Sequence, residues 1–165
     1  MRDMDVIGVR VEGPSNQPIV LLRESSGDRY LPIWIGAVEA TAIAFAQQGV
    51  TPPRPLTHDL LKDVLEATDQ ELVEVRIVDV KDGIFFAVLV LASGVEVSAR
   101  PSDSIALALR TGSPVVVSEE VLSEAGIHAP AQEDEVEKFR EFLDQVTPED
   151  FEAPQGEEPG DSTSS

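Results

Sequence analysis

Four side chains that could take part in catalysis lie within the segment Arg100-Pro101-Ser102-Asp103-Ser104. The arginine could contact a phosphate, the hydroxyls could donate or accept hydrogen bonds, and the carboxylate could bind a cation. Residues 105–108 follow as an apolar run, which predicts a buried helix. We expect Ser102 to be its N-cap and Asp103 to lie in its first turn, where a carboxylate meets unpaired amides. The same residues are also an ordinary way to begin a helix.

A second acidic residue bears the same relation to an earlier helix. Leu31-Pro32-Ile33-Trp34-Ile35-Gly36 leads into an alanine-rich segment over residues 37–44. Aligning the two helices places Glu39 over Asp103, and this match predicts two strand-strand-strand-helix repeats. The matched letters are few and mostly alanine, so chance is the alternative. If the helices begin side by side, the two carboxylates could hold Mg²⁺ or Mn²⁺; otherwise each carboxylate stabilises its own helix dipole.

His58 and Arg100 each have two interpretations, and Arg54 is a further candidate. His58 could act as a general base near neutral pH, or pack against its own helix, where Asp59 would be a helix-start charge. Arg100 could bind phosphate or form a structural ion pair with Asp103. Arg54, between prolines on a stiff connector, is a candidate phosphate contact.

Trp34 also has two interpretations, because a tryptophan can form part of the core or provide a surface on which a base stacks.

The composition restricts the class of protein. The chain has 165 residues, 42% of them hydrophobic, and no cysteine, which excludes disulfides and thiolate metal sites. No apolar run approaches the roughly 20 residues of a membrane helix, and the first residues lack a signal-peptide hydrophobic region. We therefore expect a cytoplasmic protein that does not enter a membrane.

The net charge of −19 is spread over the whole chain. Residues 131–165 contain 12 acidic residues against Lys138 and Arg140, and residues 1–130 contain 19 acidic and 10 basic residues. A nucleic-acid binder usually shows a basic surface, so this balance argues against tight binding of long duplexes. The acidic composition does not exclude a local cluster of arginines that contacts phosphate.

The pattern along the chain predicts an α+β fold with a mixed, mostly antiparallel sheet and buried alanine-rich helices. The expected strands are 6–11, 19–22, 29–35, 72–81, 84–91, 95–99 and 115–117, with 84–91 central and covered on both faces. The expected helices are 37–48, one capped by Thr57, one from Ser102 to near Gly112, and 118–126.

The expected organisation is a domain over 1–130, an acidic amphipathic helix over 131–147 and a disordered acidic tail over 148–165. The apolar sheet and alanine-rich helices predict a homo-oligomer, either a dimer or a trimer.

Three blocks together resemble the bifunctional nuclease family. They are Leu31–Gly36 with Glu39-Ala40, Arg54-Pro55-Leu56-Thr57-His58-Asp59-Leu60, and Arg100–Ala108, in the family's order. The resemblance covers roughly residues 3–128 and implies a compact mixed α/β domain with DNase and RNase activity. The residues that match its blocks are Glu39, His58, Asp59, Arg100, Ser102 and Asp103. The acidic tail lies outside the resemblance.

Two hypotheses follow. In the first, the protein is a metal-assisted nuclease acting on single-stranded or loosely structured DNA and RNA. Glu39 and Asp103 bind the ion, His58 handles protons, and Arg100, Arg54 and Ser102 contact the nucleic acid. In the second, it is a non-catalytic oligomeric binding or regulatory module whose acidic tail contacts a basic partner. The second is motivated by the net charge and by the absence of a recognised nuclease constellation.

Overall fold

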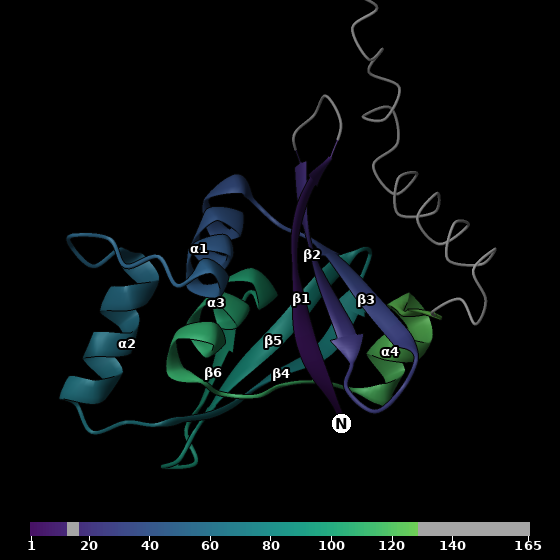
Figure 1. Cartoon of the computed structure of the whole chain (residues 1–165). Helices are drawn as coiled ribbons and strands as arrows, with labels where there is room; N and C mark the ends of the chain where they lie inside the picture. The colour runs from purple at the N-terminus through teal and green to yellow at the C-terminus, as the bar shows by residue number, and fades with distance from the viewer. Residues whose placement is uncertain (13–16, 129–165) are drawn as a thin grey trace, which may run out of the picture.

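The computed structural model describes residues 1–12 and 17–128; the predicted acidic helix 131–147 and tail 148–165 lie outside them. The described strands form an eight-stranded sheet in the order β6-β5-β4-β7-β1-β2-β3-β8 (Figure 1). The strands are β1 (Arg2–Glu12), β2 (Gln17–Glu24), β3 (Arg29–Trp34), β4 (Leu72–Lys81), β5 (Ile84–Leu91), β6 (Glu96–Ala99), β7 (Val115–Val117) and β8 (Ile127–His128). The helices are α1 (Ala37–Gln48), α2 (Thr57–Ala67), α3 (Pro101–Thr111) and α4 (Glu119–Ala125).

All neighbouring strands are antiparallel except β4 and β7, which run parallel. The α+β class and the mixed, mostly antiparallel sheet are therefore confirmed. Strand β8 was not predicted, because two residues are too few to show a pattern.

The fold contains the predicted strand-strand-strand-helix repeat twice. Strands β1 to β3 lead into α1, and strands β4 to β6 lead into α3, with α2 between the two units. Strand β7 lies between the two sets and pairs with β1 on one side and β4 on the other. The order of the strands thus places the two units on opposite sides of β7, and each unit ends in a helix with an acidic residue in its first turn.

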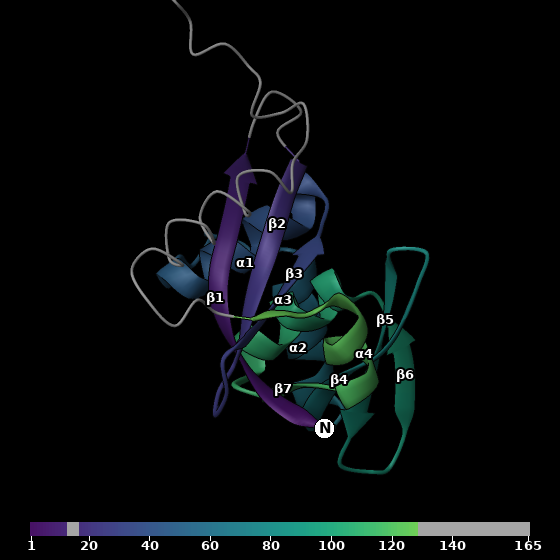
Figure 2. The same ribbon diagram turned by 90° about the vertical axis from the view of Figure 1, so that its right-hand side faces the viewer.

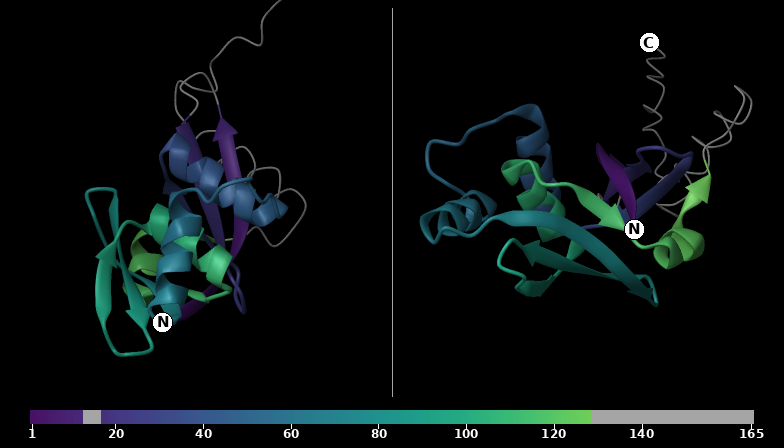
Figure 3. Two further views of the ribbon diagram at one scale, coloured as in Figure 1. Left: turned by 90° about the vertical axis from the view of Figure 1, so that its left-hand side faces the viewer. Right: turned by 90° about the horizontal axis from the view of Figure 1, so that it is seen from below.

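Helices α1 and α3 pack against each other and against the sheet, and α2 packs on α3. The right-hand view of Figure 3 shows these three helices together and α4 apart from them, where α4 packs on β3 and β4. In Figure 2, α4 faces the viewer. Small buried residues on both helices, including Ala40, Ala42, Ala106 and Ala108, allow α1 and α3 to approach closely. None of the described helices is long and apolar enough to cross a membrane.

The centre of the core is formed by α3, as its apolar sequence predicted. Residues 105–108 are all buried, and Ile105 and Leu107 are completely so. They belong to a continuous hydrophobic cluster that includes strand residues of both repeats, such as Leu22, Leu31 and Ile77. Because the core is shared, the two repeats form one packed unit, and the N-terminus of α3 is held in a fixed position relative to α1.

Glycines end two of the helices and form part of one tight turn. Gly49 and Gly112 end α1 and α3 in the left-handed conformation, with φ of 68° and 72°. Asp82 and Gly83 form the β4–β5 turn, also with positive φ. The register of β4 shifts between Ile77 and Asp79, which is a β-bulge.

Two predicted N-caps are wrong by one or two residues. Helix α3 is capped by Arg100, with Pro101 as its first residue, so Ser102 lies inside the helix. Proline suits this position because its missing amide proton has no partner there anyway. Helix α2 begins at Thr57 with Leu56 as its cap, and the Asp59 carboxylate accepts the Leu56 amide at 3.0 Å.

Two apolar segments are less covered than predicted. Strand β5 lies beside the four-residue edge strand β6, and its Ile84 is 62% exposed while Ala87 is buried. The strand is apolar on both faces, but only one face meets the core. In α2 the apolar stripe remains largely exposed and only His58 is buried. An apolar pattern shows which residues can be buried, but it does not show how much of the fold is available to cover them.

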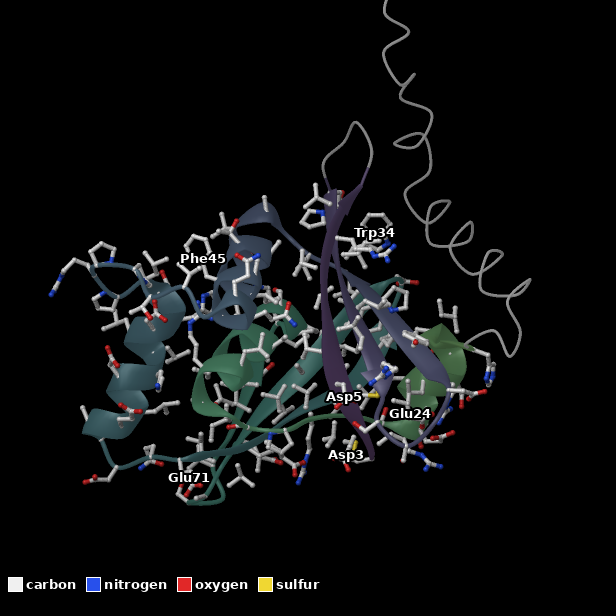
Figure 4. All side chains as sticks on the ribbon, viewed as in Figure 1. Asp3, Asp5, Glu24, Trp34, Phe45 and Glu71 are labelled. Carbon is white, nitrogen blue, oxygen red and sulfur yellow. The ribbon has the colours of Figure 1, made fainter. Side chains whose placement is uncertain are left out.

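An ion cluster around Arg29 joins β2, β3 and α4. Arg29 donates to the buried Glu24 and to Glu119, both at 2.9 Å (Figure 4 labels Glu24). The hydrogen bond from Arg29 outweighs burial and lowers the pKa of Glu24. Bonds from Arg29 and Arg2 lower the pKa of Glu119 to about 2. The ion cluster therefore stabilises the fold above pH 4.5, the ordinary value, and loses this contribution as the pH falls towards 2.

We predict that Arg29→Ala lowers the free energy of unfolding by roughly 3 kcal/mol, because it leaves the Glu24 carboxylate buried without its partner. Urea denaturation at neutral pH measures the loss. The matched control is Arg23→Ala, which removes an exposed ion pair with Asp5 and is expected to cost less than about 1 kcal/mol. Equal losses for the two variants would contradict this assignment.

Candidate active site

The first turns of α1 and α3 bring Glu39, Arg100 and Asp103 together. Arg100 Nη2 donates to Glu39 Oε1 at 2.6 Å and to Asp103 Oδ2 at 2.7 Å. Arg100 Nε donates to the same Asp103 oxygen at 2.9 Å. The two acidic residues that the repeat aligned are thus neighbours in space, and one guanidinium joins them. Both interpretations of Arg100 remain open here, because it forms the ion pair and is still 65% exposed.

His58 completes the group from a third helix. Its Nε2 lies 2.9 Å from Asp103 Oδ1, so each carboxylate oxygen of Asp103 has a partner. We call these four residues, Glu39, His58, Arg100 and Asp103, the Arg100 cluster. The prediction that His58 packs against its own helix is therefore incomplete, because the ring reaches across to α3.

The Arg100 cluster stabilises its own charges. Burial would raise the pKa of Asp103, but hydrogen bonds from His58 and Arg100 outweigh burial and hold the pKa below its ordinary value. Hydrogen bonds to Asp103 and then Glu39 raise the pKa of Arg100. Asp103 is therefore an ionised carboxylate at neutral pH, and Arg100 is a permanent cation beside it.

Gly36 provides the space in which the Glu39 carboxylate lies. It is the N-cap of α1, with φ of −78°, a conformation open to any residue. A β-carbon at this position would collide with Glu39 Oε2, however. The end of the Glu39 side chain would therefore have to shift to admit a larger residue, and glycine allows it to lie at the helix N-terminus near Arg100.

A second arginine, which the sequence analysis did not identify, fixes the three helices relative to one another. Arg110 donates to Asp59 Oδ1 at 2.7 Å, to the Ala42 carbonyl at 3.0 Å and to the Ala106 carbonyl at 2.8 Å. Its hydrogen bond is the main cause of the lowered pKa of Asp59. Asp59 is thus both the predicted helix-start charge and an inter-helix partner. The signal in the sequence was a lone arginine near the end of an apolar helix.

The Arg100 cluster does not form a ready metal site. Glu39 and Asp103 both accept from Arg100, so an ion between them would have to displace the guanidinium. In residues 1–12 and 17–128, no group of three or more His, Cys, Asp or Glu residues could hold a metal ion.

The remaining predicted residues lie at different distances from this group. Ser102 is buried and lines a cleft of about 300 Å³ beside Arg100, together with Trp34. The interpretation of Trp34 as a core residue is wrong, because its side chain is 38% exposed. Arg54 is exposed on the α1–α2 connection, and the structure shows no contact between it and the Arg100 cluster.

Comparisons with known proteins show which proteins this chain resembles. A sequence model of the bifunctional nuclease domain matches residues 20–130. A protein of Mycobacterium tuberculosis strain H37Rv, named only as uncharacterized, is 56% identical over 163 residues, which cover 93% of this chain and 99% of that protein. A protein of Oryza sativa subsp. japonica named bifunctional nuclease 1 is 25% identical over 128 residues. The match covers 74% of this chain but 38% of the rice protein.

We predict that Arg100→Gln raises the pKa of Asp103 towards its ordinary value, because the variant removes one of the two partners that stabilise the ionised form. Carboxyl-carbon chemical shifts recorded by NMR over a pH series measure this. Arg76→Gln is the matched control, since Arg76 pairs with Glu74 and Glu96 instead. An Asp103 titration that is the same in both variants would show that Arg100 does not govern this carboxylate.

Proposed function

The chain belongs to the bifunctional nuclease family, and from this membership we propose that it hydrolyses phosphodiester bonds of both DNA and RNA with broad specificity. The observation that carries the proposal is the Arg100 cluster. It combines an exposed cation with two carboxylates and a histidine, all contributed by the three segments that match the family's blocks. Phosphodiester hydrolysis needs groups of these kinds, namely a cation for the phosphate and a group that moves protons.

Arg100 is proposed to hold the scissile phosphate. Its Nε and Nη2 are bonded to Asp103 and Glu39, whereas its Nη1 makes no hydrogen bond to another described residue. The Nη1 hydrogens can therefore donate to phosphate oxygens without breaking the bonds that fix the guanidinium. Because the carboxylates hold the cation before substrate arrives, its orientation costs little when charge develops on the phosphate.

His58 is proposed to move the proton. Asp103 engages Nε2, which leaves Nδ1 to accept the proton of the attacking water. The water oxygen then bonds to phosphorus, the bond from phosphorus to the leaving oxygen breaks, and the imidazolium returns the proton to that oxygen. Asp103 stabilises the imidazolium during this cycle. In this scheme Glu39 positions Arg100.

Assistance by Mg²⁺ or Mn²⁺ stays a prediction. The donor set does not fit an ion while Arg100 occupies the space between Glu39 and Asp103, so the steps above use only side chains. Cleavage measured in Mg²⁺, Mn²⁺ and EDTA tests the point. The side-chain scheme predicts that activity persists in EDTA, and complete loss that Mg²⁺ or Mn²⁺ restores would contradict it.

Self-association as a dimer or trimer is also a proposal. It is supported by apolar side chains exposed on and before α2, namely Leu56, Leu60, Leu61 and Val64. Light scattering of the full chain is expected to give a mass of two or three chains, and the mass of one chain would contradict the proposal.

We predict that Asp103→Asn lowers the rate of cleavage of labelled single-stranded DNA and RNA by about 10²–10⁴-fold, because the amide cannot stabilise the imidazolium. The matched control is Asp5→Asn, purified identically, in which an exposed aspartate of β1 is changed instead (Figure 4). The control is expected to cleave at the wild-type rate. Equal rates for Asp103→Asn and wild type would show that the activity does not arise at the Arg100 cluster.

A further inference from the structure

The cleft beside Arg100 has features that the hydrolytic scheme does not use. It has a volume of about 300 Å³ and lies between the end of β3, the β4–β5 turn and the start of α3. This volume is at the small end of the range of roughly 300–1,000 Å³ for small-molecule sites. The cleft can therefore accept one flat ring system, but not a double helix. Because Arg100 lines it, a group bound there would be adjacent to a phosphate held by the Arg100 cluster.

One side of the cleft is aromatic and apolar. Trp34, Ile84 and Phe85 line it, and both Trp34 and Ile84 are exposed although each is large and apolar. Figure 4 shows Trp34 at the end of β3, at the surface of the protein. An exposed indole beside a charged group is typical of a surface that binds a flat ligand by stacking.

Ser102 provides an independent observation at the same place. It lines the cleft and is 6% exposed, yet its hydroxyl makes no hydrogen bond to any described residue. The neighbouring Ser104 differs, because its hydroxyl donates to the Arg100 carbonyl at 2.7 Å. Buried hydroxyls are normally paired, so an unpaired one beside an open cleft indicates a ligand with a polar edge.

We propose that this cleft binds one unpaired nucleobase of the substrate strand. The base stacks on Trp34, its polar edge bonds to the Ser102 hydroxyl, and its phosphate reaches Arg100. The inference rests on the proposed nuclease function and adds the substrate class, a single strand or an unpaired loop. Bases within a duplex cannot enter, because their faces are covered by neighbouring bases.

The acidic character of the chain agrees with this mode of binding. Residues 1–130 carry a net negative charge, so the general electrostatic attraction that dominates duplex binding is absent. Affinity must then come from short-range contacts. Stacking is such a contact and tolerates any base, which is compatible with a nuclease that accepts both DNA and RNA.

Trp34 is the single tryptophan of the chain, so its fluorescence reports on the cleft directly. We would titrate the full-length Asp103→Asn variant with a short oligothymidylate in EDTA. A blunt-ended duplex without an unpaired loop and an abasic strand with the same number of phosphates serve as the comparison ligands. We expect quenching by the oligothymidylate only. Equal quenching by the abasic strand, or no quenching by any ligand, would overturn the proposal.

Variants separate stacking from a general effect on the fold. Trp34→Ala is expected to weaken binding of a dye-labelled oligothymidylate, measured by anisotropy, by about 5- to 150-fold, whereas Trp34→Phe retains a stacking ring and most of the affinity. Ser102→Ala is expected to weaken binding without changing the urea midpoint, since its hydroxyl has no protein partner. Val95→Ala, at an exposed apolar residue between β5 and β6, is the matched control and is expected to bind as wild type. Unchanged affinity in Trp34→Ala would overturn the proposal.

The two proposals fail in different ways. Fluorescence quenching specific for the single strand, with no cleavage by wild-type protein, would support the base site and contradict the nuclease function. Cleavage that depends on Asp103 but proceeds equally on single strands and duplexes, with Trp34→Ala fully active, would support the nuclease function and contradict the base site.

Discussion

The ionic bridge through Arg100 is the interaction on which the rest of the site depends. Two repeats each end in a helix that packs on the shared core, and packing these helices together brings Glu39 and Asp103 into one place. Two carboxylates this close would repel each other, and a cation between them offsets this repulsion where the helices meet. Arg100 supplies this cation from the N-cap of α3. The exposed part of the same guanidinium is then available to a phosphate, so one residue serves both the fold and the proposed chemistry.

Much of the fold could be predicted because its signals are local. Gly49, Gly112 and the Asp82-Gly83 turn are fixed by backbone conformations that glycine favours, and the repeat was visible in the alignment of Glu39 with Asp103. The incorrect or missing predictions concern features that depend on tertiary packing between distant segments. The exposure of Trp34 depends on how little of the fold covers the end of β3, and the three contacts of Arg110 depend on how three helices converge. The four residues of the Arg100 cluster could be selected as candidates from the sequence. Only the structure shows that the two carboxylates bind an arginine.

The overall negative charge of an acidic protein repels the phosphates of a nucleic acid, so binding must come from contacts at a local site. The chain carries a net charge of −19, and the carboxylates of the Arg100 cluster hold Arg100 in an ion pair. Binding therefore cannot rely on general attraction of the phosphate backbone, and it favours substrates that offer something besides charge. In the proposed base site, aromatic and hydroxyl groups beside the cation meet this need by recognising an unpaired base whose own phosphate reaches Arg100. In this account the acidity of the chain contributes to selectivity, since it disfavours the long duplex.

The central claim is that the carboxylates of the two repeats act as one catalytic unit through Arg100. The most direct test is a double-mutant cycle on cleavage of a single-stranded oligonucleotide, with Glu39→Gln, Asp103→Asn and the double variant purified identically. Residues that act as a unit are not additive, so the double variant is predicted to cleave at about the rate of the slower single variant. Fully additive losses, or single variants that both keep the wild-type rate, would contradict the account.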